Sequence, residues 1–469
     1  MGRKKPAEPG KDLLLFEKVI LAAVWLFGTL FMLLVIFRYV INVSPIIKYF
    51  KWYAVLLIAA VLLHLLITKL KYPQTTYRIK NYLGKMKSFE QIFVIALFIW
   101  FAVVCAVREW IDQASYFKTA DWWLLDSAVS ALIFFPMAYY FSRVKKGKPL
   151  DLMLHIVALV YTVFTAWSLW HIFHLNFLTL PSGNQIGMAK TFSLLLGCNR
   201  NITGALAFTI LAIACYMMFT QKTVWKIIYG VVAAVQLYTA LLSNSRAVYI
   251  CVLFLGAACG FLLGLNLMKK QKTAPRLAVS CLLAGICVFI LWRLHSAAFT
   301  LFDSVTNFKV LANSKIASVE DAARSSVSLN GREKIWIASL KTMISSPEAF
   351  FFGVTPFNAP NVLHSLGGMK VYPAHAHNII LQVGVSMGVP AMIAFIAFLV
   401  KIAVNCIRSV WKAKGKDLNR FGMISVIIAS LILLNMAESY LVVYYSIMSS
   451  VFFLACGSIT YTKPAGDLQ

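Results

Sequence analysis

Residues 203–267 read TGALAFTILAIACYMMFTQKTVWKIIYGVVAAVQLYTALLSNSRAVYICVLFLGAACGFLLGLNL, and they decide the fold class. Three apolar runs, 203–220, 224–242 and 247–267, are separated only by short polar turns. Because a helix needs about 20 apolar residues to cross the hydrocarbon of a bilayer, each run is long enough for one crossing. The stretch therefore predicts three membrane-spanning helices in succession.

The same pattern extends over the whole chain. Of its 469 residues, 60% are hydrophobic and 13% are charged, and the mean hydropathy is +0.77. These values exclude an ordinary water-soluble domain of this size. A helix satisfies its own backbone in lipid, and the runs lack the alternation of a barrel strand, so we expect an all-α polytopic membrane protein. The expected spans, about twelve by length, lie near 14–38, 53–69, 91–107, 122–141, 152–172, 203–220, 224–242, 247–267, 276–297, 378–400, 422–438 and 440–458.

The chain is expected to form one integrated membrane domain in three parts. Residues 1–297 carry the first nine spans, residues 298–377 form one large extracytoplasmic loop, and residues 378–469 carry the last three spans and a cytoplasmic tail. A loop of this length is usually functional. Within it, GREKIWIASLKTMI has the spacing of an amphipathic helix at the membrane interface, with Arg332, Trp336, Leu340 and Met343 on one face.

Basic residues predict the orientation. Most of the 44 Lys and Arg residues fall in segments that share one side of the membrane, among them KLKYPQTTYRIKNYLGKMK, SRVKKGK, LMKKQKTAPR and residues 401–420. The positive-inside rule places this side, and with it both termini, in the cytoplasm. Basic loops that bind an anionic inner leaflet then account for the net charge of +27, and no nucleic acid is needed to explain it.

The cysteines indicate no particular chemistry. Of nine cysteines, only Cys198 falls in an outer loop, and the others lie in or beside expected spans. Neither a disulfide framework nor a CxxC metal pair is available, so they are interpreted as small apolar residues.

Charged residues gather at the outer ends of the expected spans. Charges at such positions are costly and usually functional, although long side chains can also reach the headgroups. Their distribution suggests a polar cavity open to the outer leaflet. Arg246 lies in a turn too short to leave the membrane surface, so its guanidinium must meet lipid phosphate or another part of the protein. The charges concerned are Arg38, Arg108, Asp126, Arg246, Arg293 and Glu438.

Two histidines flank Ala376 where the long loop re-enters the membrane. His375 and His377 could form a metal pair, but no nearby cluster of Asp, Glu or Cys completes a ligand shell. A general base is the better use, because imidazole titrates near neutral pH. Asn378, which follows, can accept hydrogen bonds from backbone donors at a helix start.

Four motifs, in this order and around one large loop, resemble the O-antigen ligase and polymerase family of bacterial membrane glycosyltransferases. They are NRNITG at 199–204, SNSRA at 243–247, the R-x-x-x-W of GREKIW at 331–336 and AHAHN at 374–378. Arg200 stands where the family commonly has a proline, and the first six spans carry no diagnostic residue.

The resemblance implies a GT-C-like fold in the bacterial cytoplasmic membrane, with the active site facing the periplasm or the cell exterior. It implies transfer of a glycan from undecaprenyl diphosphate to a hydroxyl of a glycan or glycolipid, with inversion and without metal or cofactor. By matching position, Arg246 and Arg332 would hold the diphosphate and His377 would be the base, with His375 a second candidate. Membrane lipids would be the other partners. Possible supporting residues are Arg200, Asn201, Asn378, Arg293 and Glu438.

Other functions remain open at the level of sequence. A lipid-linked oligosaccharide flippase or another twelve-helix transporter would bind near the bilayer midplane and show related halves, which are not evident here. A non-catalytic scaffold is also possible. Within the family, the motifs do not separate an O-antigen ligase from a polysaccharide polymerase or a protein O-glycosylating enzyme, since these differ in the acceptor.

Overall fold

The computed structural model describes residues 11–37, 44–71, 88–143, 147–174, 178–179, 185–188, 192–193, 200–306, 332–367, 373–413, 415–442 and 446–460. The N-terminal half forms α1 (Lys11–Phe37), α2 (Ser44–Lys71), α4 (Phe89–Asp112), α5 (Tyr116–Val129), the π-helical segment η1 (Ser130–Phe134), α6 (Phe135–Arg143), α7 (Lys148–Phe173), α8 (Arg200–Thr220) and α9 (Thr223–Leu242). The remainder forms α10 (Arg246–Leu267), α11 (Thr273–Thr306), α14 (Arg332–Met343), α15 (Pro347–Phe352), α16 (Thr355–Gly367), α17 (Ile379–Met387), α18 (Val389–Lys412), α19 (Lys416–Asn435) and α20 (Ile447–Ile459).

Helices of membrane-spanning length dominate this part of the chain. Among the described residues, 10 helices are long and apolar enough to cross a bilayer, which confirms the all-α polytopic fold. The expected run at 53–69 lies within α2, a helix of 28 residues, and the run at 440–458 corresponds to the shorter apolar helix Ile447–Ile459. The twelve expected runs are therefore present, and the last of them forms a helix of 13 residues.

The expected span at 378–400 is wrong in its boundaries. The chain breaks at Gly388, whose φ is 90°, so that α17 ends at Met387 and α18 begins at Val389. A Cβ at Gly388 would lie 2.1 Å from the carbonyl oxygen of Phe351 in α15. This close approach of two backbones requires glycine, and an apolar run read by hydropathy alone does not reveal it.

The end of α19 also departs from the expected continuous spans. After Asn435 the chain leaves the helix, and residues 436–442 are irregular, with Glu438 and Tyr440 buried. Asn435 Oδ1 accepts a hydrogen bond of 2.5 Å from the Tyr440 backbone N–H, and Ser446 Oγ donates one of 2.7 Å to the Tyr440 carbonyl. Irregular backbone in a membrane protein is tolerated where it is buried in protein. This segment brings Glu438 into the interior.

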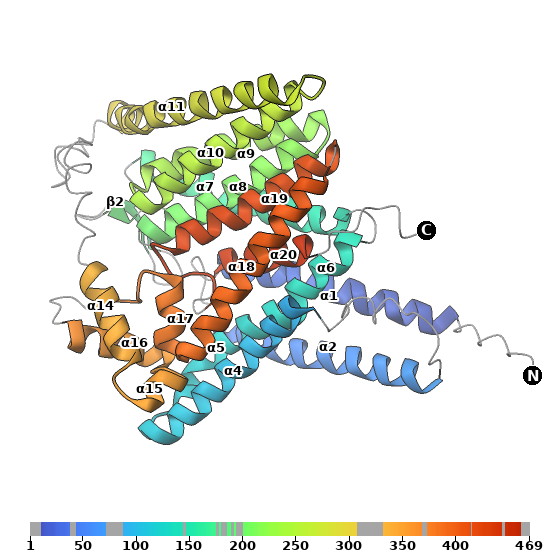
Figure 1. Ribbon diagram of the computed structural model, residues 1–469, viewed down its shortest axis with the longest axis vertical. Coiled ribbons are helices and arrows are strands. Elements are labelled where there is room, and N and C mark those ends of the chain that lie inside the picture. The colour runs from blue at the N-terminus through green and yellow to red at the C-terminus, as the bar shows by residue number, and fades with distance from the viewer. Residues whose placement is uncertain are drawn as a thin grey trace, which may run out of the picture.

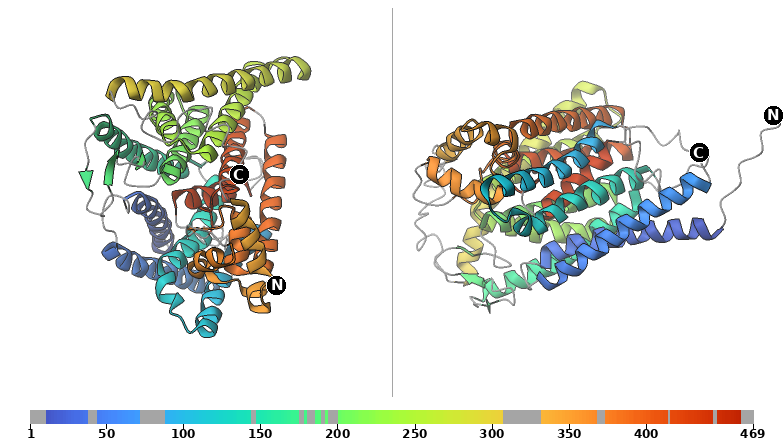
Figure 2. Two further views of the ribbon diagram at one scale, coloured as in Figure 1. Left: turned by 90° about the vertical axis from the view of Figure 1, so that its left-hand side faces the viewer. Right: turned by 90° about the horizontal axis from the view of Figure 1, so that it is seen from below.

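The core lies around α8, which packs against α9, α10 and α19. Small residues allow the close contact: at Gly204, a Cβ would lie 2.3 Å from Ser243 Oγ in the turn between α9 and α10. Figures 1 and 2 show α14, α15 and α16 gathered at one end of the bundle, with the start of α1 at the other end.

A small sheet follows α7. Strands β1 (Leu178–Thr179), β2 (Gln185–Met188) and β3 (Phe192–Ser193) pair antiparallel in the order β1-β2-β3. The sequence analysis required no strands, so these short strands were not expected. They belong to a connection between helices and leave the helical fold class unchanged.

Candidate active site

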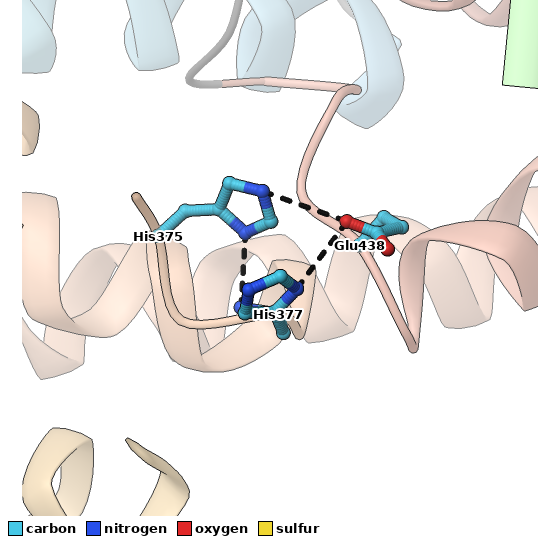
Figure 3. A group of neighbouring side chains, drawn as sticks. All are labelled: His375, His377 and Glu438. Carbon is cyan, nitrogen blue, oxygen red and sulfur yellow. Dashed lines mark hydrogen bonds and ion pairs between the residues drawn. The ribbon is translucent and has the colours of Figure 1, made fainter. Parts of the chain in front are cut away.

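Glu438 lies at the centre of a polar cluster formed by distant parts of the chain. Its side chain is 2% exposed. Oε1 lies 3.3 Å from Arg332 Nη2 and accepts a hydrogen bond of 3.1 Å from Asn201 Nδ2. Oε2 lies 3.5 Å from His375 Nε2 and 3.3 Å from His377 Nδ1. Figure 3 shows both imidazole rings turned toward this carboxylate. The two histidines lie on one chain segment, and Glu438 lies on another.

His375 and His377 differ in how their ring nitrogens are used. The His377 backbone N–H donates to His375 Nδ1 at 3.1 Å. His375 Nδ1 must therefore carry the lone pair, and the ring proton of neutral His375 lies on Nε2, which faces Glu438. Burial, the neighbouring His377 and the Arg332 cation hold the pKa of His375 well below its usual value of 6.5. His375 is thus a neutral bridging group whose lone pair is already engaged.

His377 is held in an unusual backbone conformation. Its φ is 50°, in the left-handed region that costs energy for a residue with a Cβ and that often marks functional sites. Asn378 directly follows and caps α17, accepting from the backbone N–H groups of Ile380 and Leu381 at 3.0 and 3.3 Å. This confirms the helix-start geometry expected for Asn378. The His377 side chain remains 22% exposed, so the ring is accessible.

Side chains of α17 and α4 hold the histidine segment and the end of α17 in place. Gln382 Oε1 accepts from the Ala376 backbone N–H at 2.7 Å, and Trp100 Nε1 donates to the Met387 carbonyl at 2.8 Å. Arg332 is the first residue of α14, which packs against α16 and α17. On the expected face of α14, Leu340 is 53% exposed and Met343 is 2% exposed. The helix buries Ile335, Ala338, Ser339, Thr342 and Met343.

Arg246 begins α10, after the turn of residues 243–245, and its side chain is exposed. Asn244 adopts a φ of 48°, a conformation that asparagine tolerates better than most residues. The turn packs on Gly204, one helical turn beyond Asn201. Arg246 therefore lies on the end of the bundle that carries Asn201 and the Glu438 cluster.

The other expected supporting residues divide into two groups. Asn201 and Glu438 belong to the cluster. Arg293 is exposed on α11, the neighbour of α10, and the structure places it in none of the contacts given above. Arg200 begins α8, but its side chain lies outside the described residues. Tyr440, which the sequence analysis missed, donates its hydroxyl to Glu438 Oε2 at 3.3 Å.

The cluster also contains a set of residue types that can bind metals. Ligand-type atoms of His375, His377 and Glu438 lie within 4.8 Å of one another, so the expectation that no carboxylate joins the histidine pair is wrong. However, an ion on His375 Nε2 would require the ring proton to move to Nδ1, which accepts from the His377 backbone. The arrangement therefore suits hydrogen bonding and proton transfer better than metal coordination.

Part of the chain matches a known family. Residues 231–396 match the model of the O-antigen ligase family, a family of glycosyltransferase type. The matched region begins in α9 and ends in α18, so it contains Arg246, Arg332, His375 and His377. Glu438 lies beyond it. No curated protein matches the chain.

Proposed function

We propose that this chain is a membrane glycosyltransferase that moves a glycan from undecaprenyl diphosphate to a hydroxyl acceptor, with inversion at the anomeric carbon. One observation carries the proposal: a cation, Arg332, and two imidazoles, His375 and His377, meet on one buried carboxylate, Glu438. A cation that can hold a leaving diphosphate and a base that can take a hydroxyl proton are the two groups this reaction needs.

His377 is the base in this proposal. With its Nδ1 toward Glu438 Oε2 at 3.3 Å, a neutral ring carries its proton on Nδ1 and its lone pair on Nε2. A carboxylate behind the imidazole orients it and stabilises the imidazolium that forms. His375 is assigned a bridging role because its Nδ1 lone pair already accepts from the His377 backbone.

Transfer then proceeds in one displacement. The acceptor oxygen attacks the anomeric carbon, and its proton passes to His377 Nε2. The bond between the anomeric carbon and the phosphate oxygen breaks, and its electron pair stays on undecaprenyl diphosphate. Arg332 and Arg246 stabilise the charge on that leaving group, since guanidinium groups bind phosphate in a bidentate way. No step requires a metal or another cofactor.

The proposed orientation places the cluster on the periplasmic or exterior face of the cytoplasmic membrane, with residues 298–377 as the extracytoplasmic loop. The helix ends away from the cluster carry basic residues, as expected for a cytoplasmic face. These residues are Lys148, Lys222, Lys269, Lys270, Lys412 and Lys416. Both termini are cytoplasmic in this proposal.

Transfer by purified protein in proteoliposomes tests the function. The donor is undecaprenyl diphosphate bearing a radiolabelled glycan, offered with three acceptors in parallel: a lipid A-type glycolipid, a second donor molecule and a serine-containing peptide. We expect label to move to one of them, with undecaprenyl diphosphate released and with no loss of rate in EDTA. Label that crosses the bilayer on its lipid, with no transfer to any acceptor, would instead identify a flippase.

A further inference from the structure

Glu438 is shared between the group assigned to the donor and the group assigned to the acceptor. Arg332 Nη2 lies 3.3 Å from Oε1, and His377 Nδ1 lies 3.3 Å from Oε2. The Arg332 side chain is 26% exposed and the Glu438 side chain 2% exposed. The cation thus reaches the buried carboxylate from the accessible side. This inference rests on the proposed function. In it, binding of the donor to Arg332 affects how His377 acts on the acceptor, because both side chains share Glu438.

The contact between His377 and Glu438 is incomplete in the free protein. Although the two atoms are 3.3 Å apart, the buried Nδ1 atom of His377 does not make a hydrogen bond of acceptable geometry. Catalytic hydrogen bonds are often poorly aligned before substrate binds and tighten afterward. Arg332 lies on the other oxygen of the same carboxylate, Oε1, so its cation offsets the negative charge that would otherwise strengthen a hydrogen bond from His377 to Oε2.

We propose that Arg332 exchanges Glu438 for the diphosphate of the donor, so that Glu438 completes its hydrogen bond to His377 only after the donor has bound. A diphosphate offers several charged oxygens to a guanidinium, against the single oxygen that Glu438 presents. The exchange makes the reaction ordered, with the donor first and the activated acceptor second.

The carboxylate can lose Arg332 without becoming an unsatisfied buried charge. Asn201 Nδ2 still donates to Oε1 at 3.1 Å, and the Tyr440 hydroxyl still donates to Oε2 at 3.3 Å. Both donors are neutral at working pH. The negative charge of Glu438 is then no longer neutralised by a guanidinium, and it acts on the imidazoles alone.

The two changes of charge near His377 that accompany donor binding act in the same direction. The segment 436–442 contributes Glu438 and Tyr440, the segment before α17 contributes His375, and α14 contributes Arg332. His375 stays neutral in both states because its Nδ1 accepts from the backbone. Withdrawal of the cation and arrival of an anionic donor both favour a protonated His377.

Titration of the His377 ring tests the exchange. Protein with ¹³C-labelled histidine in lipid nanodiscs is titrated by NMR, with the His377 signal assigned by its loss in His377→Gln. Undecaprenyl diphosphate, the product, is the probe. In the parent it should move the His377 midpoint upward by about one pH unit or more. Arg332→Gln should show this upward shift without the probe and little further shift with it.

The control is Lys334→Gln, which removes an exposed cation from the same helix and should titrate like the parent. An unchanged His377 midpoint in Arg332→Gln without the probe would overturn the proposal, as would a probe-induced shift of full size in that variant. If the probe does not bind the parent at all, the proposed function is contradicted. The comparison of Arg332→Gln with the parent then still decides whether Arg332 controls His377 through Glu438.

Discussion

Glu438 Oε2 lies 3.3 Å from Nδ1 of His377, although α17, α18 and α19 separate the two residues along the chain. Both residues sit in short non-helical segments that helices hold in place. The segment of His377 is fixed by the cap of α17, and that of Glu438 by Asn435 and Ser446. The helical bundle therefore serves as the frame for two irregular segments that carry the chemistry.

Glu438→Gln should lower kcat by a factor of about 10² to 10³ while leaving the KM for the donor within about threefold, because an amide cannot stabilise the imidazolium on His377. Glutamine keeps the size of the side chain and an acceptor oxygen for Asn201, so the fold should be retained. Steady-state transfer and thermal unfolding of the purified variant check both points. A variant with parental kcat would remove Glu438 from the mechanism.

Arg246→Ala and Arg332→Ala should each weaken use of the donor by about ten- to a hundredfold in kcat/KM, the loss expected for a charged hydrogen bond of about 1.5–3 kcal/mol. Lys341→Ala, which removes an exposed cation from the last turn of α14, is the matched control and should stay near the parent. Equal effects of all three substitutions would indicate general electrostatics rather than a diphosphate site.

The sequence predicted most of the fold, because long apolar runs in lipid leave few alternatives to helices. Two features were hidden from it. Gly388 splits the run at 378–400 through a backbone contact with Phe351, and the run at 440–458 begins with the irregular segment that carries Tyr440. Both depend on tertiary contacts, whereas hydropathy averages over neighbours along the chain.

The candidate site was predicted only in part, because the sequence shows local motifs but not tertiary contacts. Arg332, His375 and His377 stand in short local motifs, so the sequence shows them directly. The position of Glu438 at the centre depends on the packing of α19 and α20. Its only sequence signal was a carboxylate within an apolar run, which is costly unless paired. Tyr440 gave no signal, since tyrosines are common in spans.

Gly388→Ala should destabilise the protein by about 2–4 kcal/mol, because the new methyl group overlaps the Phe351 carbonyl and the φ of 90° disfavours alanine. Gly230→Ala, in α9 with nothing within 4 Å of its Cβ position, is the control and should be neutral or stabilising by up to about 1 kcal/mol. Thermal unfolding in detergent compares them. Parental stability of Gly388→Ala would contradict the close approach of α15 to this turn.

The lowered pKa of His375 also predicts a pH dependence of stability. The folded chain binds the His375 proton more weakly than the unfolded chain does, because burial and Arg332 disfavour the charged ring. This contribution to stability is present above the usual pKa of 6.5 and is lost progressively as the pH falls below it. The loss should be smaller in His375→Gln. If the unfolding midpoint changed by the same amount from pH 7 to pH 5 in the parent and in His375→Gln, the result would contradict a neutral buried His375.

The most direct test of the account is single-turnover transfer at saturating donor, comparing His377→Gln with His375→Gln. Because His377 supplies the base, His377→Gln should slow the chemical step by a factor of about 10² to 10⁴, while binding of undecaprenyl diphosphate stays at the parental level. His375→Gln, which removes only a bridging group, should retain most of the rate. Full transfer by His377→Gln, with loss of transfer in His375→Gln, would contradict the assignment of the base.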